Sequence, residues 1–463
     1  MSGSDAQRAV DPIRERLAAY AAGLHFDDLP VEVVHAAKLR IIDTLGALVG
    51  GLSGAPCQIA RSVASRTADA DGATVIGTRT KASPELAAFA NATAARYLEF
   101  SDFYHWPGSL DGHASDIVLP ALAVAEHARA SGRDLITAIV LGYEVFLRFC
   151  DIFPNGGFDY TNCSVLGSAV AAGKLLDLTP EQMGHCISMA VVPNVILKQV
   201  RRDGKTGFKP AATGHAARAG VFAALLAEAG LDGPNLPFVG RVGFCDFVLG
   251  RRFSLDVLGG DGTPFKILDS QVKIRPSERN TVPLILAAEK LAPLPPPDAI
   301  HRITVEIYRK AIDAVGTGKE IWKPQTREAA YHSIPYVVAA ALTEGSITLG
   351  SFNENRLSDP RLREIMDKID LLENEDFTRA FLSEPVEHRA RITVVLNNGE
   401  RLVAETGGQE AVRPDSDERQ IIRKFRSLTD EALGESRVTA LLQTLLHLEN
   451  EDDVSAIPPE FAL

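Results

Sequence analysis

The sequence predicts a mainly α fold, in which a large all-helical domain is accompanied by a smaller α+β domain. The chain has 463 residues, which is more than a single hydrophobic core usually holds. Before residue 260, apolar residues recur at three- and four-residue steps, as they do on one face of a helix. After residue 300, β-branched residues alternate with polar ones, as in a strand. Two domains of different class are therefore expected.

Helices follow one another through the N-terminal part. Pro30 opens the first, in which Leu39, Ile42 and Leu45 share one face, and Gly50 ends it. Thr179 has the residue type of an N-cap, and Pro180 follows at the first helical position. Abundant Ala and Gly predict closely packed helix backbones. The other helices are expected at 87–100, 120–130, 135–149, 164–176, 211–219 and 216–230.

The α+β pattern begins near residue 268. A strand is expected at 301–308, and a hairpin is expected where 389–396 and 401–404 flank the turn residues Asn398-Gly399. Between and before these strands, helices are expected at 283–291, 329–342 and 360–369. The tail from Asp417 returns to helical periodicity. We therefore predict a large helical domain at 1–267, an α+β domain at 268–405, and a C-terminal helical segment at 406–463 that returns to the large domain.

Composition excludes several classes of function. The net charge is −12, from 48 Lys and Arg against 60 Asp and Glu, so no nucleic-acid partner is expected. No apolar run reaches the roughly 18 residues of a membrane span, and no secretory signal precedes the first helix, so no membrane is expected and the cytoplasm is the predicted location. Five widely spaced cysteines predict buried thiols rather than a zinc site or a disulfide framework. Nucleotide-binding and zinc-protease motifs are also missing from the sequence.

Polar segments between the apolar helices hold the candidate chemistry. Residues 99–116 combine acidic side chains, two histidines and aromatics in one loop, and carboxylates and imidazoles move protons near neutral pH. Asp102 and His113 are the candidate acid and base here. The alternative is a solvated loop, and Asp116 is expected mainly to cap the next helix.

Two further segments point to anion binding. Residues 198–210 carry a cluster of Lys and Arg in an otherwise acidic chain, which suits a polycarboxylate or phosphate ligand, although a mobile basic surface loop has the same composition. Residues 271–280 lie at the predicted domain junction, where small-molecule sites concentrate.

A fourth segment, 326–336, is polar at its start, and its lone histidine also fits a structural role at a helix start.

Taken together, these segments resemble the MmgE/PrpD family, which includes 2-methylcitrate dehydratase, cis-aconitate decarboxylase and iminodisuccinate epimerase. The resemblance runs over nearly the whole chain and depends on the order and spacing of motifs that are each weak alone. Residues 326–336 are the most specific of them and most resemble the 2-methylcitrate dehydratase branch. The motifs are His35–Gly46, Leu98–Asp102, Gly112–Asp116 with Leu119–Leu122, Gly167–Leu176, Lys209–Ala212, Lys273, Thr326–Tyr336 and Lys424–Phe425.

The resemblance implies a smaller domain that acts as a lid, a homodimer, an active site in the cleft between domains, and chemistry without a metal or cofactor at a carbon next to a carboxylate. The positions that match the family's catalytic set are Glu99, Asp102, His113, Lys209 and Lys273. Several positions depart from the family pattern, which changes the charge and reach of the side chains. Tyr160 stands where relatives carry histidine, and Glu278 where decarboxylase relatives carry one. Glu99 stands where Asp is usual, Phe103 where Thr is usual, and Tyr331 where the dehydratase motif has Asp.

The resulting hypothesis is a cofactor-independent lyase that acts on a small di- or tricarboxylate, first of all a dehydratase of a 2-methylcitrate-like hydroxy acid. Alternatives are an epimerase or decarboxylase on the same scaffold, or a relative that binds carboxylates without turnover. We expect Lys209, Lys273 and Arg201 to bind carboxylate, Asp102 and His113 to act as acid and base, and Tyr160 to donate a proton. The remaining substrate-binding candidates are Glu99, Glu278, Arg279, Tyr331 and His332.

Overall fold

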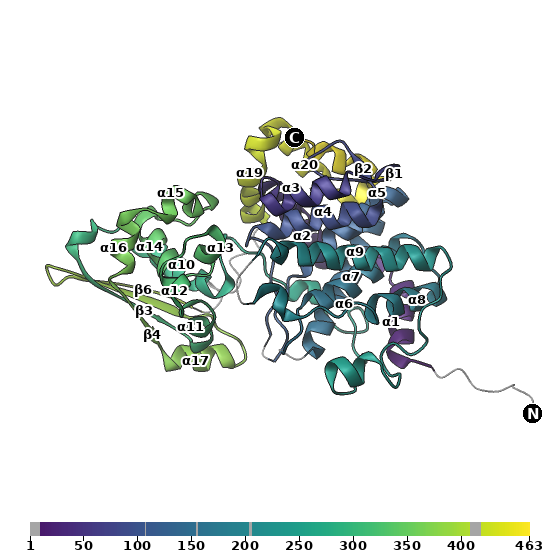
Figure 1. Cartoon of the computed structure of the whole chain (residues 1–463), viewed down its shortest axis with the longest axis horizontal. Helices are drawn as coiled ribbons and strands as arrows, with labels where there is room; N and C mark the ends of the chain where they lie inside the picture. Colours follow the sequence, from purple (N-terminus) through teal and green to yellow (C-terminus); the bar gives the residue numbers. More distant parts are fainter. Residues whose placement is uncertain (1–9, 107, 154–155, 203–205, 408–417) are drawn as a thin grey trace, which may run out of the picture. The chain divides into compact units, whose positions relative to one another are not determined.

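The computed structural model describes residues 10–463 apart from 107, 154–155, 203–205 and 408–417. The chain divides into two compact units (Figure 1). Unit 1 comprises Met1–Val272 and Glu418–Leu463, and unit 2 comprises Lys273–Asp417. The boundaries predicted from the sequence, at 268 and 406, lie five and twelve residues earlier.

Unit 1 is the helical domain that the sequence predicts. Helix α9 packs against both α4 and α7, and α19 of the C-terminal segment packs along α2 (Figure 1). A small two-stranded sheet, which the sequence analysis missed, pairs β1 (Ala68–Thr74) with β2 (Lys81–Ala82). The helices are α1 (Pro12–Gly23), α2 (Val31–Gly51), α3 (Ala55–Ala64), α4 (Pro84–Tyr97), α5 (Val118–Ala128), α6 (Gly132–Ile152), α7 (Thr161–Leu175), α8 (Pro180–Val191), α9 (Phe208–Glu228), α19 (Glu418–Leu433) and α20 (Glu435–Leu446).

Helix ends differ from the prediction in two places that matter for the candidate site. Helix α4 ends at Tyr97 rather than at Phe100, because Leu98 takes an extended conformation, and Glu99 therefore lies in the turn that follows. The segments predicted at 211–219 and 216–230 form the single helix α9, which starts at Phe208 and so carries Lys209 in its first turn. The predicted cap of α8 is confirmed, since the Thr179 side chain accepts a hydrogen bond from the Gln182 backbone N–H.

The close packing of α7 and α9 depends on Gly220. A Cβ at this position would lie 2.6 Å from both the Val165 carbonyl oxygen and the Ser168 Cβ. We expect Gly220→Ala to lower the free energy of unfolding by about 1–3 kcal/mol, measured by urea denaturation, because the helices must separate. Gly23→Ala is the control, since an added Cβ there meets nothing within 4 Å. Equal losses in the two variants would contradict this explanation.

Unit 2 is the α+β domain. Its four-stranded sheet has the order β4-β3-β5-β6, in which β3 pairs in parallel with β4 and antiparallel with β5, and β6 completes the predicted hairpin (Figure 1). Ile303, Val305 and Ile307 of β3 point to one buried face, and α10 packs on β5 and β6. The strands are β3 (Ile300–Ile307), β4 (Ile369–Glu373), β5 (Ala390–Leu396) and β6 (Arg401–Thr406).

The helices of unit 2 correct two predictions. The helix expected at 360–369 ends earlier, and Ile369 instead begins β4, which the sequence analysis did not predict. The helix expected at 329–342 is two helices, separated at His332 and Ser333, where the Ser333 side chain caps the second helix. The helices are α10 (Val282–Leu291), α11 (Arg309–Val315), α12 (Lys319–Trp322), α13 (Arg327–Tyr331), α14 (Ile334–Glu344), α15 (Glu354–Leu357), α16 (Pro360–Met366) and α17 (Glu375–Leu382).

The structure also describes the cysteines and the hydropathy of the helices. All five cysteines fall within the described residues and are buried free thiols, as predicted. Across the described part of the chain, no helix has both the length and the hydropathy of a membrane span.

Candidate active site

The turn after α4 brings a carboxylate to the start of α9. The Glu99 carboxylate forms an ion pair with the Lys209 ammonium group, and both residues are buried. The Arg96 guanidinium, in the last turn of α4, lies 3.7 Å from the same carboxylate. Two cations and one anion thus share a site that water barely reaches, where electrostatic interactions are stronger than at the surface.

The Glu99 turn is held in place by the C-terminal segment. The Lys424 ammonium group on α19 donates a hydrogen bond to the Phe100 carbonyl oxygen and lies 4.0 Å from the centre of the Phe100 ring. Lys424 also pairs with the buried Asp43 carboxylate of α2 at 2.6 Å. Burial raises the pKa of Asp43, and Lys424 opposes that rise. The segment after residue 418 therefore helps to position the candidate site.

His113 has a defined partner on each ring nitrogen. Nδ1 bonds to the backbone carbonyl oxygen of Asp102, and Nε2 lies 2.7 Å from the Arg96 Nη2 atom. A carbonyl oxygen can only accept a hydrogen bond and a guanidinium can only donate one. The contacts therefore assign the proton to Nδ1 and leave Nε2 as an acceptor, so the ring is neutral.

Asp102 and His113, the predicted acid and base, are brought together, but not through the Asp102 carboxylate. That carboxylate is fully buried, and it accepts hydrogen bonds from the Ser115 backbone N–H at 3.0 Å and the Tyr143 hydroxyl at 3.1 Å. The pair is joined instead by the Asp102 backbone. In this geometry the carboxylate orders the loop that carries His113.

Tyr160 lies between two guanidinium groups. Its hydroxyl oxygen accepts a hydrogen bond from Arg96 Nε at 3.1 Å, and the Arg201 guanidinium lies 4.7 Å from its ring centre. Arg201 is itself held by Asp159, with which it makes hydrogen bonds of 2.6 and 2.9 Å. Burial raises the pKa of Tyr160, and the two cations oppose that rise. The positive charge of Arg201, predicted to bind carboxylate, is thus balanced within the protein.

Asp116 does not cap the following helix, contrary to the prediction. Its buried carboxylate accepts hydrogen bonds from the Ser164 hydroxyl at 2.8 Å and the Thr213 hydroxyl at 3.3 Å, on α7 and α9. Burial raises the pKa of Asp116 to about 7, and Arg96 is the largest influence in the opposite direction. Asp116 is therefore a titrating group beside the Arg96 cluster, defined here as Arg96, Glu99, His113, Tyr160 and Lys209.

The other predicted residues belong to unit 2. Lys273 is 2% exposed. The Glu278 side chain caps the short helix Arg279–Thr281, and the Glu278 backbone N–H bonds to the Tyr331 carbonyl oxygen. The Tyr331 hydroxyl accepts a hydrogen bond from Arg327 at 2.8 Å, and His332 Nδ1 bonds to the Glu328 carbonyl oxygen at 2.9 Å. Unit 2 thus brings the 278–279 and 331–332 segments together.

Arg96 and Asp159 were not predicted as members of the site, and Asp116 was predicted only as a helix cap. Arg96 gave a usable signal, because it is the only Lys or Arg in the Ala-rich segment 87–100 that was predicted as a helix. Such a charge requires a buried partner. The partners themselves lie 17 and 64 residues further along the chain, and only the fold brings them to Arg96.

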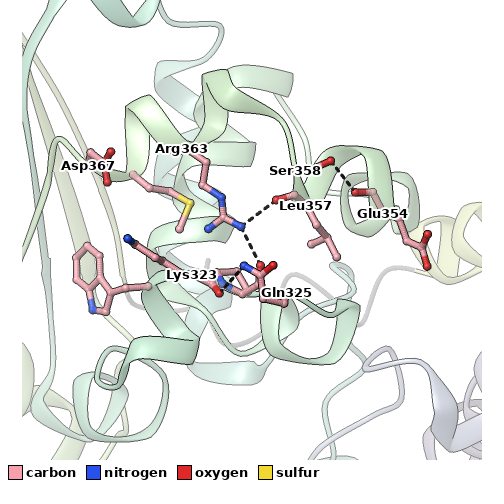
Figure 2. Close-up of a pocket in the computed structure, with 10 residues that line it drawn as sticks. Lys323, Gln325, Glu354, Leu357, Ser358, Arg363 and Asp367 are labelled. Atoms are coloured by element: carbon pink, nitrogen blue, oxygen red, sulfur yellow. Dashed lines mark hydrogen bonds between the residues drawn. The ribbon is translucent and has the colours of Figure 1, made fainter.

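A separate pocket of about 620 Å³ lies in unit 2 and contains none of the predicted site residues. Arg363 lines this pocket, and its guanidinium donates hydrogen bonds to the Leu357 and Pro324 carbonyl oxygens, as Figure 2 shows. The carboxylates of Glu354 and Asp367 lie at opposite ends of the view. The pocket wall therefore has mixed charge, and its arginine is engaged with backbone.

Comparisons with known proteins agree with this division of the chain. The pattern of the MmgE/PrpD N-terminal domain matches residues 15–256, and that of the MmgE/PrpD C-terminal domain matches residues 276–449. The chain belongs to the MmgE/PrpD family. The resemblance predicted from the motifs is thereby confirmed.

Three relatives in the MmgE/PrpD family are named as decarboxylases or as a dehydratase. The chain is 29% identical to cis-aconitate decarboxylase of Homo sapiens, over 97% of this chain and 96% of the relative. It is 24% identical to cis-aconitate decarboxylase of Aspergillus terreus, with the same shares covered. With 2-methylcitrate dehydratase of Escherichia coli strain K12 it shares 26% identity over 73% of each chain. Family membership and these relatives support an enzyme of the lyase type.

Proposed function

We propose that this protein is a lyase that acts on a small di- or tricarboxylate without a cofactor, with dehydration of a 2-methylcitrate-like hydroxy acid as the first activity to test. The observation that carries the proposal is the Arg96 cluster in unit 1, where two cations, a tyrosine hydroxyl and a carboxylate meet in a buried site. Family membership supplies the class of substrate.

The proposed chemistry needs three functions. A base removes a proton from the carbon next to a carboxylate, an acid protonates the leaving hydroxyl, and cations stabilise the enolate-like charge that develops. Lys209 suits the third function because it is a buried cation at the start of α9. Tyr160 suits the second, because its hydroxyl oxygen accepts from Arg96 and its proton is directed elsewhere.

For the first function the structure favours no single group in unit 1. The Asp102 carboxylate accepts two hydrogen bonds from the protein, and His113 Nε2 already accepts from Arg96. We propose that Lys273, Glu278 and Arg279 of unit 2 also serve substrate binding or proton transfer, and that Tyr331 and His332 border the substrate. Alanine substitution of each residue, followed by assay of turnover and binding, tests these roles.

Decarboxylation is the second candidate, and a specific observation favours it. The relatives that match nearly the whole chain are named cis-aconitate decarboxylases, whereas the dehydratase matches 73% of it. Both reactions pass through a carbanion next to a carboxylate, so the same cations serve either. Epimerisation would leave the carbon skeleton intact and remains the third outcome of the assay.

A product assay by proton NMR in deuterated water separates these reactions. We expect 2-methylcitrate to lose water, which replaces its methyl doublet with the methyl signal of the alkene product. Release of carbon dioxide from cis-aconitate with an alkene product would instead identify the decarboxylase. Deuterium exchange at the α-carbon without net reaction would indicate an epimerase. Calorimetric binding of these acids with no turnover of any would contradict the lyase and favour a carboxylate-binding protein.

The resemblance also leads us to propose a homodimer in the cytoplasm. Light scattering on the purified protein gives its mass directly, against 49.8 kDa for one chain. A mass of a single chain at micromolar concentration would contradict the dimer.

A further inference from the structure

We propose that Arg96 and Tyr160 form an oxyanion subsite within unit 1 that binds a carboxylate of the ligand. The proposal deepens the proposed function, on which it rests for the class of ligand. The subsite does not include the ion pair of Glu99 and Lys209. Its hydrogen-bond donors are Arg96 of α4 and Tyr160, which directly precedes α7.

Arg96 retains one donor without an acceptor. Its Nε atom donates to the Tyr160 hydroxyl oxygen and its Nη2 atom lies 2.7 Å from His113 Nε2, whereas its buried Nη1 atom has no hydrogen-bond partner among the described residues. The side chain as a whole is 5% exposed. A buried N–H without a partner is costly, and a ligand oxygen would remove that cost.

Tyr160 supplies a second donor beside the first. Because its oxygen accepts from Arg96 Nε, the hydroxyl proton points away from the guanidinium, and it donates to no atom of the described residues. The donors and acceptors in the series Asp102–His113–Arg96–Tyr160 are fixed, because the Asp102 carbonyl oxygen can only accept a hydrogen bond and the Arg96 guanidinium can only donate. Two donors therefore remain for a ligand, the Arg96 Nη1 group and the Tyr160 hydroxyl.

The charge at this place suits an anion. The carboxylate nearest to the guanidinium is that of Glu99, at 3.7 Å from Nη2, and Glu99 also pairs with Lys209. The Arg201 guanidinium lies 4.7 Å from the centre of the Tyr160 ring and is neutralised by Asp159. Burial raises the pKa of Asp116 to about 7, so at pH 6 most of its negative charge is lost. A carboxylate or an enolate oxygen matches two donors and a buried cation.

Calorimetric titration with malonate, with neutral malonamide as the comparison ligand, tests the subsite without any turnover. We expect malonate to bind the unmodified protein and malonamide not to bind. Arg96→Met and Tyr160→Phe should each weaken malonate binding about tenfold or more, because each removes one donor. Arg66→Met removes an exposed arginine charge from the same unit and should leave the affinity unchanged.

Three results would overturn the subsite. They are no malonate binding to the unmodified protein, unchanged affinity in both variants, or equal loss in Arg66→Met. Tyr160→Phe removes a single oxygen, so it keeps the test open if Arg96→Met fails to fold. Nitrogen NMR of His113 is an independent check, because protonation of Nε2 in the ligand-free protein would contradict the assigned direction of the Arg96 bond. If the unmodified protein bound malonate as expected but turned over none of the tested acids, the proposed reaction would be wrong and the subsite would still stand.

Discussion

Turnover should fall by on the order of 10²–10³-fold when Lys209 is replaced by Met, while substrate binding weakens less. Lys209 lies in the first turn of α9 with its ammonium group on Glu99, in a place that water barely reaches. A buried cation whose position is fixed stabilises charge that develops during the reaction more than charge already present in the ground state. Steady-state kinetics with the best substrate from the product assay would measure kcat and KM separately.

Stability must be separated from catalysis in this variant. Removing Lys209 takes away the ammonium partner of the buried Glu99 carboxylate, which still lies 3.7 Å from Arg96, and breaking a buried pair costs about 3–5 kcal/mol. The double variant Glu99→Gln with Lys209→Met removes both charges and should recover most of that loss in urea denaturation. If the double variant regained turnover as well as stability, the catalytic role of Lys209 would be wrong.

The helices of unit 1 were predictable because their apolar spacing is regular and their packing faces are rich in Ala and Gly. The end of α4 was not, since Ala-rich residues continue as far as Tyr97 and only the extended backbone at Leu98 ends the helix. Strand β4 was missed for a similar reason. The segment Ile369–Glu373 follows a helix at once and lacks a period-two pattern, and its strand conformation depends on pairing with β3.

The candidate site shows the same limit at the level of single residues. Lys209 and Glu99 were identified from motifs that are local in sequence. The partner of each, however, is 110 residues away, so that their ion pair became visible only in the fold. His113 was predicted as a base from its residue type and its place in a local motif, whereas the structure shows that Arg96 already occupies its Nε2 atom. Residue type indicates which groups can move protons, but the tertiary contacts decide which of them can do so.

Asp116 should make the protein less stable as the pH rises from about 4 to about 7. Burial raises its pKa to about 7 in the folded protein, against about 3.9 for an aspartate in an unfolded chain. Within this window the folded state holds a proton that the unfolded state has released. The contribution of Asp116 to the free energy of unfolding is therefore greatest below pH 4. Between about pH 4 and pH 7 this contribution declines by up to about 1.4 kcal/mol per pH unit.

Asp116→Asn should remove this contribution, because an amide does not titrate. Urea denaturation of both proteins at several pH values between 4 and 8 would give the free energy of unfolding against pH, and the two slopes should differ by the contribution of Asp116. Contributions that the two proteins share, such as that of the buried Asp43, cancel in this difference. Asp232→Asn, which changes an exposed carboxylate, is the matched control. Parallel stability curves for the unmodified protein and Asp116→Asn would show that Asp116 keeps its charge when buried. In that case Arg96, the largest influence that lowers its pKa, must stabilise the carboxylate more than burial destabilises it.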